Sequence, residues 1–333
     1  MMNKRFMALA PLLIFLALSP FLLRMHVRMN AGSAANLTVP TGVAAPLGVA
    51  PDIDARLAKF KPVQMPFDGA GLSEREQQMV KKLVDAANCI ERIYWRQSDP
   101  EGLQLYNKLE KSSDPLDKKV LRFMKINGSR YDLIDELHPF VGKEAAPPGR
   151  ALYPTDLTQA EAEKYVAAHP AEKEAMYSEN SLLERDGNKL VAVPYHIAFA
   201  ELLKPAAENL RDAAKLSDDP AFAKFLNLRA DALLNDDLYA SDLAWLDLNN
   251  PKFDLILAPY ESYLDNLLGV RTSYGAAVLI RNEEESKKLE VFRKYVPDLQ
   301  EALPLGKKDL PSKRGHVTPM EVMDAPFRTG DLL

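Results

Sequence analysis

The histidines of this 333-residue sequence are too far apart to form a familiar zinc motif. No two lie three or four residues apart, so no helix can present a pair on one face, and H-E-x-x-H is absent. A catalytic zinc ion needs about three protein ligands. The sequence therefore predicts no metal ligand and no catalytic residue in this chain. The histidines are His26, His138, His169, His196 and His316.

Other chemical signatures are also missing. The single cysteine, Cys89, excludes an internal disulfide and a cysteine-based zinc site, and we expect it to pack as a small apolar side chain in a helix. The sequence has no G-x-G-x-x-G, P-loop or G-x-S-x-G motif. The acidic run Asn235-Asp236-Asp237 lacks the spacing of a calcium loop, which favours a solvated helix end. Net charge is −5 without a basic stripe, so a nucleic-acid partner is not expected.

One segment combines polar and aromatic residues at the end of an expected strand. The strand Phe253 to Leu257 leads through Ala258-Pro259 into Tyr260-Glu261-Ser262-Tyr263. The Glu261 carboxylate could bind the free amino terminus of a peptide, and the Tyr263 hydroxyl could bind a peptide carbonyl. In the alternative reading, Glu261 caps a following helix and the tyrosines pack internally. From the residues alone both readings stay open. If the first is right, the side chains of Glu261 and Tyr263 should point into one open groove.

The surrounding pattern predicts an α+β fold that is mainly helical, with a small mixed β region. Ser73 and Glu76 form a capping box before an amphipathic helix. A turn at Asp186-Gly187 predicts a hairpin over Leu182 to Val193. Further strands are expected at Phe253 to Leu257 and Ala276 to Ile280, and the residues after 304 show no helix or strand pattern. The expected helices cover Met79 to Tyr94, Pro115 to Ile126, Thr158 to Ala168, Ile197 to Leu216, Ala221 to Leu234 and Glu283 to Leu303.

The N-terminus is a segment of a different kind. Lys4 and Arg5 precede an apolar run from Phe6 to Leu23, which is typical of a signal peptide or a membrane anchor, so we expect export to the periplasm or anchoring in the cell envelope. Contact with a membrane is expected through this segment alone. The sequence divides into residues 1–29 as signal peptide or anchor, 30–55 as flexible linker, 56–303 as the folded lobe and 304–333 as a tail.

The run Tyr260-Glu261-Ser262-Tyr263-Leu-Asp265, followed by Gly269-Val-Arg271, resembles the E-S-Y-x-D…G-x-R segment of dipeptidyl peptidase III. Ser241-Asp242-Leu-Ala-Trp245 falls where that family has its counterpart, and Val193-Pro194-Tyr195-His196 resembles a further stretch of the bacterial members. Together they cover roughly residues 56–333 in collinear order. The resemblance implies the lower lobe of a two-lobed zinc metallopeptidase, a hydrolase that removes dipeptides from peptide amino termini. It also implies that Glu261 and Tyr263 hold the substrate's N-terminal end.

In that family the zinc motif, a later glutamate ligand and the asparagines of the substrate site come after the point where this sequence stops. The resemblance therefore implies the N-terminal, substrate-binding part of such an enzyme, truncated before the zinc motif and inactive alone. Zinc is expected for the complete family enzyme and not for this chain. Short peptides and a separate C-terminal half are the expected partners. Two alternatives stay open: a non-catalytic peptide-binding or interaction protein of the cell envelope, and an unrelated helical domain.

Overall fold

The computed structural model describes residues 48–63, 67, 69–306, 308–309 and 321–332. The predicted signal or anchor segment lies outside these residues. Within them, no helix is both long enough and apolar enough to cross a lipid bilayer. The predicted linker extends to residue 55, but the helix α1 already begins at Ile53, which is buried.

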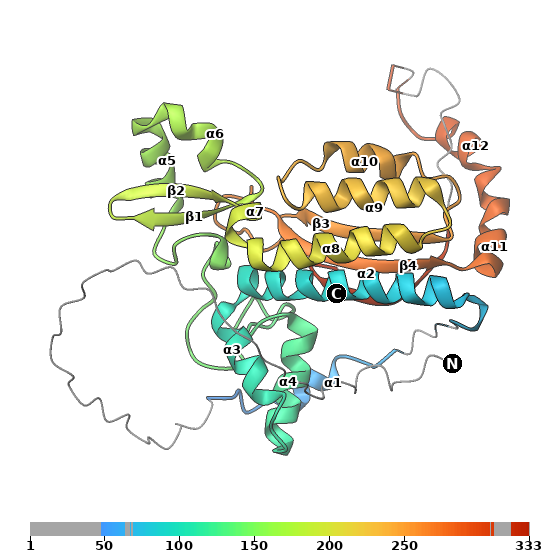
Figure 1. Ribbon diagram of the computed structural model, residues 1–333. Coiled ribbons are helices and arrows are strands. Elements are labelled where there is room, and N and C mark those ends of the chain that lie inside the picture. The colour runs from blue at the N-terminus through green and yellow to red at the C-terminus, as the bar shows by residue number, and fades with distance from the viewer. Residues whose placement is uncertain (1–47, 64–66, 68, 307, 310–320, 333) are drawn as a thin grey trace, which may run out of the picture.

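The fold is α+β and mainly helical, as predicted (Figure 1). Its strands form a two-stranded sheet β1-β2 and a three-stranded sheet in the order β3-β4-β5, and all the pairings are antiparallel. The strands are β1 (Ser181–Asp186), β2 (Lys189–Pro194), β3 (Phe253–Glu261), β4 (Ser273–Arg281) and β5 (Met323–Gly330). The α-helices are α1 (Ile53–Ala58), α2 (Glu74–Ser98), α3 (Pro100–Leu109), α4 (Pro115–Asn127), α5 (Gln159–Ala168), α6 (Lys173–Met176), α7 (Tyr195–Ala198), α8 (Ala200–Leu216), α9 (Pro220–Ala232), α10 (Tyr239–Leu246), α11 (Glu283–Arg293) and α12 (Val296–Glu301).

Helix α2 is the central element, and local sequence explains where it starts. The Ser73 hydroxyl accepts from the Glu76 amide while the Glu76 carboxylate accepts from the Ser73 amide, which is the predicted capping box. Apolar residues then recur at helical spacing, so one face packs against α8 and another against β4 and β5. Tyr94 belongs to the main apolar cluster and Trp95 to a second cluster with α1, α3 and α4. Helix α2 therefore joins the two parts of the core.

Cys89 lies on α2, where it is partly buried against the main cluster and its thiol contacts the Asp85 carbonyl, with Sγ 3.6 Å from the oxygen. Burial raises the pKa of this thiol. Both observations fit the expected packing role.

The C-terminal prediction was wrong in two respects. Residues 323–330 form β5, a full strand paired with β4, although their sequence has no clear strand pattern. The predicted helix Glu283 to Leu303 is two helices, because α11 ends at Arg293 and α12 starts again at Val296 with Pro297 in its first turn. Its expected apolar stripe is largely exposed: Phe292 is 60% and Leu299 63% accessible.

Candidate functional site

Glu261 and Tyr263 lie where β3 leaves the sheet. The strand is longer than predicted and ends at Glu261, after a register shift between Pro259 and Glu261. Glu261 is exposed, and Tyr263, in the following turn, is 73% accessible. Among the described residues, no hydrogen bond or ion pair involves either side chain's polar end. This differs from the alternative reading, in which Glu261 caps a helix and Tyr263 is buried.

The turn after β3 is organised by the buried carboxylate of Asp265. Four backbone amides donate to it, those of Leu267, Leu268, Val270 and Arg271, over 2.8–3.1 Å. The Tyr153 hydroxyl donates to it as well, at 2.5 Å. Burial acts to raise the Asp265 pKa, but these hydrogen bonds outweigh it and hold the pKa below its usual range. Gly269 allows the turn to close, because its backbone has φ +69°, which most side chains disfavour.

Arg271 ties this turn to the β1-β2 hairpin. Its side chain is fully buried and donates to the Ser181 carbonyl at 2.8 Å and to the Met176 carbonyl at 2.9 Å. The guanidinium also lies over the Tyr153 ring, 4.5 Å from its centroid. The turn that carries Tyr263 is therefore held at both ends by buried polar contacts.

A second acidic residue reaches the same end of the sheet. Ser273, the first residue of β4, is paired with Glu261, and its hydroxyl lies 3.0 Å from the Glu261 carbonyl. The same hydroxyl is 2.8 Å from Oδ2 of Asp331, which follows β5. Burial raises the Asp331 pKa and the charge of Glu261 adds to the rise, against the lowering effect of the Ser273 hydrogen bond. Sequence reasoning missed Asp331 because it did not predict β5.

Tyr260 has surroundings unlike those of Tyr263. Its hydroxyl donates to Asp242 at 3.3 Å, and its ring lies 5.7 Å from the guanidinium of the buried Arg229. Arg229 in turn donates to Asp242 at 2.5 Å. Tyr260 therefore contacts residues of α9 and α10 but stays 43% exposed, so it matches only in part the internal packing of the alternative reading, and Tyr263 is left in solvent.

The histidines occupy separate places. His138 is exposed, His169 stacks on Tyr165, and His196 lies at the predicted junction between a strand and a helix. His196 pairs with Asp236, whose Oδ2 lies 2.8 Å from Nδ1 and which also accepts from the His196 amide. The expectation of a solvated acidic helix end was therefore wrong for Asp236, whose side chain is only 14% exposed.

The zinc that the resemblance implies can be tested against these donors. Across the described part of the chain, no three His, Cys, Asp or Glu side chains are grouped so that they could hold a metal ion. His26 and His316 lie outside the described residues. The described donor set therefore does not fit a zinc centre, and no chemical step through zinc follows from it.

Glu261 and Tyr263 do not line any of three well-formed cavities found among the described residues. The open groove expected at these two residues is not among them. The end of β3 instead offers an exposed carboxylate and an exposed phenol on a fixed turn. Such an arrangement can bind an amine and a carbonyl of an extended ligand at the protein surface.

Comparison with solved structures places this fold among the dipeptidyl peptidases. More particularly, it is the fold of about half of dipeptidyl peptidase III, which confirms the predicted resemblance. The enzyme from Caldithrix abyssi matches with a TM-score of 0.77 and 36% identity, over 84% of this chain and 53% of that chain. The dipeptidyl-peptidase III of Corallococcus sp. strain EGB matches with a TM-score of 0.75 and 28% identity, over 86% of this chain and 53% of that one.

A curated relative carries a different name. Nudix hydrolase 3 of Arabidopsis thaliana is 24% identical over 84% of this chain and 43% of its own length. No family model matches the chain. The chain thus spans about half the length, or less, of the relatives it matches.

Proposed function

We propose that this chain supplies the peptide-binding face of a zinc-dependent dipeptidyl peptidase of the dipeptidyl peptidase III type. Glu261 binds the positively charged amino terminus of a short peptide, and Tyr263 donates a hydrogen bond to a peptide carbonyl. The observation that carries the proposal is the Glu261 carboxylate, which has no partner among the described residues and lies at the end of β3, next to the turn fixed by Asp265. The fold shared with dipeptidyl peptidase III supports it.

The proposal includes a partner and a place in the cell. Because the described residues do not fit a zinc centre, the metal ligands are proposed to come from a polypeptide corresponding to the other half of the solved relatives. Bound zinc would supply a Lewis acid and an activated water for peptide hydrolysis. The apolar N-terminal run supports export to the periplasm or anchoring in the envelope.

Binding of a tetra-alanine peptide with a fluorophore at its C-terminus tests the role of Glu261. Glu261→Gln should weaken binding ten- to a hundredfold, since a charge-assisted hydrogen bond contributes about 1.5–3 kcal/mol. N-acetylation of the peptide should weaken binding to the unaltered chain by a similar factor. Tyr263→Phe should have a smaller effect, because it removes one neutral hydrogen bond.

The matched control is Glu284→Gln, which changes an exposed glutamate in the first turn of α11. It should leave peptide binding unchanged. Equal affinity for the free and the acetylated peptide would remove Glu261 from the substrate role. A loss of stability on Glu261→Gln without a loss of binding would point to a structural role instead.

The non-catalytic alternative, a peptide-binding protein of the cell envelope, is favoured by one observation, the absence of a metal-ligating group among the described residues. Hydrolysis of a dipeptidyl-arylamide by the chain together with the proposed partner separates the two. Chelator-sensitive turnover supports the enzyme, and peptide binding without turnover supports the alternative.

A further inference from the structure

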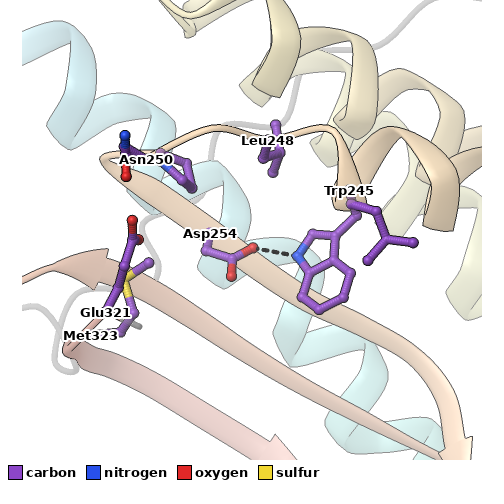
Figure 2. A pocket seen from close by; sticks show the side chains of 8 residues that line it. Trp245, Leu248, Asn250, Asp254, Glu321 and Met323 are labelled. Atoms are coloured by element: carbon purple, nitrogen blue, oxygen red, sulfur yellow. Dashed lines mark hydrogen bonds between the residues drawn. The ribbon is translucent and has the colours of Figure 1, made fainter. Parts of the chain in front are cut away.

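A cavity of about 300 Å³ lies beside the start of β3 (Figure 2). Glu261 is at the other end of that strand. Asp254, near the start of β3, lines the cavity, and Glu261 lies seven positions further along the chain. At a rise of about 3.3 Å per residue the backbones of the two residues are roughly 20 Å apart along the strand. The cavity is therefore a different place from the proposed peptide-binding turn. Its lining residues are Trp245, Leu246, Leu248, Asn250, Pro251, Asp254, Glu321 and Met323.

The indole of Trp245 forms a fixed aromatic wall of this cavity. Its Nε1–H donates to Oδ1 of Asp254 at 2.8 Å, as the dashed line in Figure 2 indicates. The Leu255 amide donates to the same oxygen at 2.7 Å. Trp245 is nevertheless 37% exposed, so part of its ring stays accessible to a ligand. A fixed indole beside a carboxylate is a favourable surface for an organic cation.

The charges of the lining favour a cation too. Asp254 and Glu321 are acidic, and the lining contains no basic residue. Both hydrogen bonds that Asp254 receives come from neutral donors, so among the described residues its charge is not paired. Glu321 has a nearby cation, since Arg281 Nε lies 3.8 Å from its Oε1, a distance too long for a hydrogen bond. Arg281 is also shared with Glu283 at 3.6 Å.

Glu321 adds an unmet hydrogen-bond acceptor. Its Oε1 is buried and has no hydrogen-bond donor among the described residues, and its side chain is 11% exposed. A buried acceptor without a donor costs free energy, which a ligand N–H could recover. Leu246, Leu248, Pro251 and Met323 add apolar walls and Asn250 adds a polar one. Leu246 is 70% exposed.

We propose that this cavity binds an arginine side chain presented by a polypeptide partner. Arginine fits the three features together. Its planar guanidinium stacks on an indole, its five N–H groups can reach two carboxylates, and its methylene stem packs against apolar walls. The exposed Leu246 offers a contact for an apolar residue beside that arginine. This site is independent of the amine-binding role proposed for Glu261.

The probe for this site is the blocked tripeptide N-acetyl-Leu-Arg-Leu-amide, with the Gln counterpart as the neutral comparison. Its acetylated terminus has no amine for Glu261 to bind. Binding is followed by tryptophan fluorescence of the full chain. The second tryptophan, Trp95, is 3% exposed and is packed in the apolar cluster with α1, α3 and α4. A change in fluorescence on binding therefore comes from Trp245. The Arg peptide should give a saturable change, and the Gln peptide should bind at least tenfold more weakly.

Asp254→Asn and Glu321→Gln should each weaken the Arg peptide about tenfold, because each keeps the side-chain shape and removes the charge. Asp247→Asn is the matched control, since Asp247 is exposed at the end of α10 and does not line the cavity. Glu261→Gln should leave this binding unchanged, which separates failure here from failure of the proposed function. Equal affinity for the Arg and Gln peptides, no saturable signal up to millimolar peptide, or equal effects of Asp254→Asn and Asp247→Asn would each overturn the proposal.

Discussion

The turn between β3 and β4 and the helices α11 and α12 hold their side chains in opposite ways. In the turn, the charged side chains of Asp265 and Arg271 are buried and hydrogen-bonded to backbone groups. On α11 and α12, the apolar side chains of Val291, Phe292 and Leu299 are more than half exposed. Buried polar contacts have definite directions, so they fix the turn in one geometry, whereas the helices present apolar surface that the described residues do not cover.

This difference predicts that substitutions in the turn destabilise the fold strongly. Asp265→Ala should lower the free energy of unfolding by about 3–4 kcal/mol, because it leaves four amides and the Tyr153 hydroxyl without their acceptor. Urea denaturation followed by circular dichroism measures the loss. Glu290→Ala, at an exposed position on α11, should change stability by less than about 0.5 kcal/mol. Similar losses of unfolding free energy for the two variants would contradict the proposed difference between the turn and the helices.

Acid should affect the same turn. The Asp265 pKa is lowered in the folded chain, so its contribution to stability is present above the unfolded pKa of about 3.9 and is lost as pH falls through the folded value. Stability of the unaltered chain should therefore fall more steeply below about pH 4 than that of Asp265→Asn. Unfolding midpoints in urea from pH 6 to pH 2.5 give the two slopes. Parallel curves would mean that Asp265 does not titrate as the geometry requires.

The helices should tolerate change. Phe292→Ser with Leu299→Ser should alter the free energy of unfolding by less than about 1 kcal/mol, since both side chains are already largely exposed. The pair should clearly reduce the binding of a hydrophobic dye, because it removes apolar surface. Leu133→Ser, which changes an exposed leucine elsewhere, is the comparison for dye binding. A large loss of stability would place the two side chains in a packed interface.

Sequence patterns predicted well the elements that are stabilised locally. The capping box of α2 and the hairpin turn at Asp186-Gly187 depend on residues close in the chain, and both are present. Strand β5 was missed because Gly330 pairs with Gly275, a partner 55 residues earlier in the chain, and its own residues show no clear alternation. The amphipathic pattern of residues 283–303 correctly indicated helix, but periodicity cannot say whether an apolar face is covered.

At the candidate site, the sequence pointed to the residues but not to the contacts that surround them. Glu261 and Tyr263 were predicted from polar residues after a strand together with the family resemblance. Both are exposed at or just after the end of β3, and their substrate role stays a prediction. The roles of Asp265 and Arg271 could not be derived in the same way, because their partners Tyr153 and Ser181 lie about 90 to 110 residues earlier. Hydrogen bonds across such separations depend on the tertiary fold, so the spacing of neighbouring residues in the sequence cannot predict them.

The lone thiol of Cys89 has a practical consequence for experiments. A chain with one cysteine accepts one spectroscopic label, and the position of Cys89 on α2 places that label on the helix that joins both apolar clusters. Because burial raises its pKa, the fraction of reactive thiolate near neutral pH is small, and labelling of the folded chain should be slow. The rate of labelling, measured by mass spectrometry, then reports on local opening of α2.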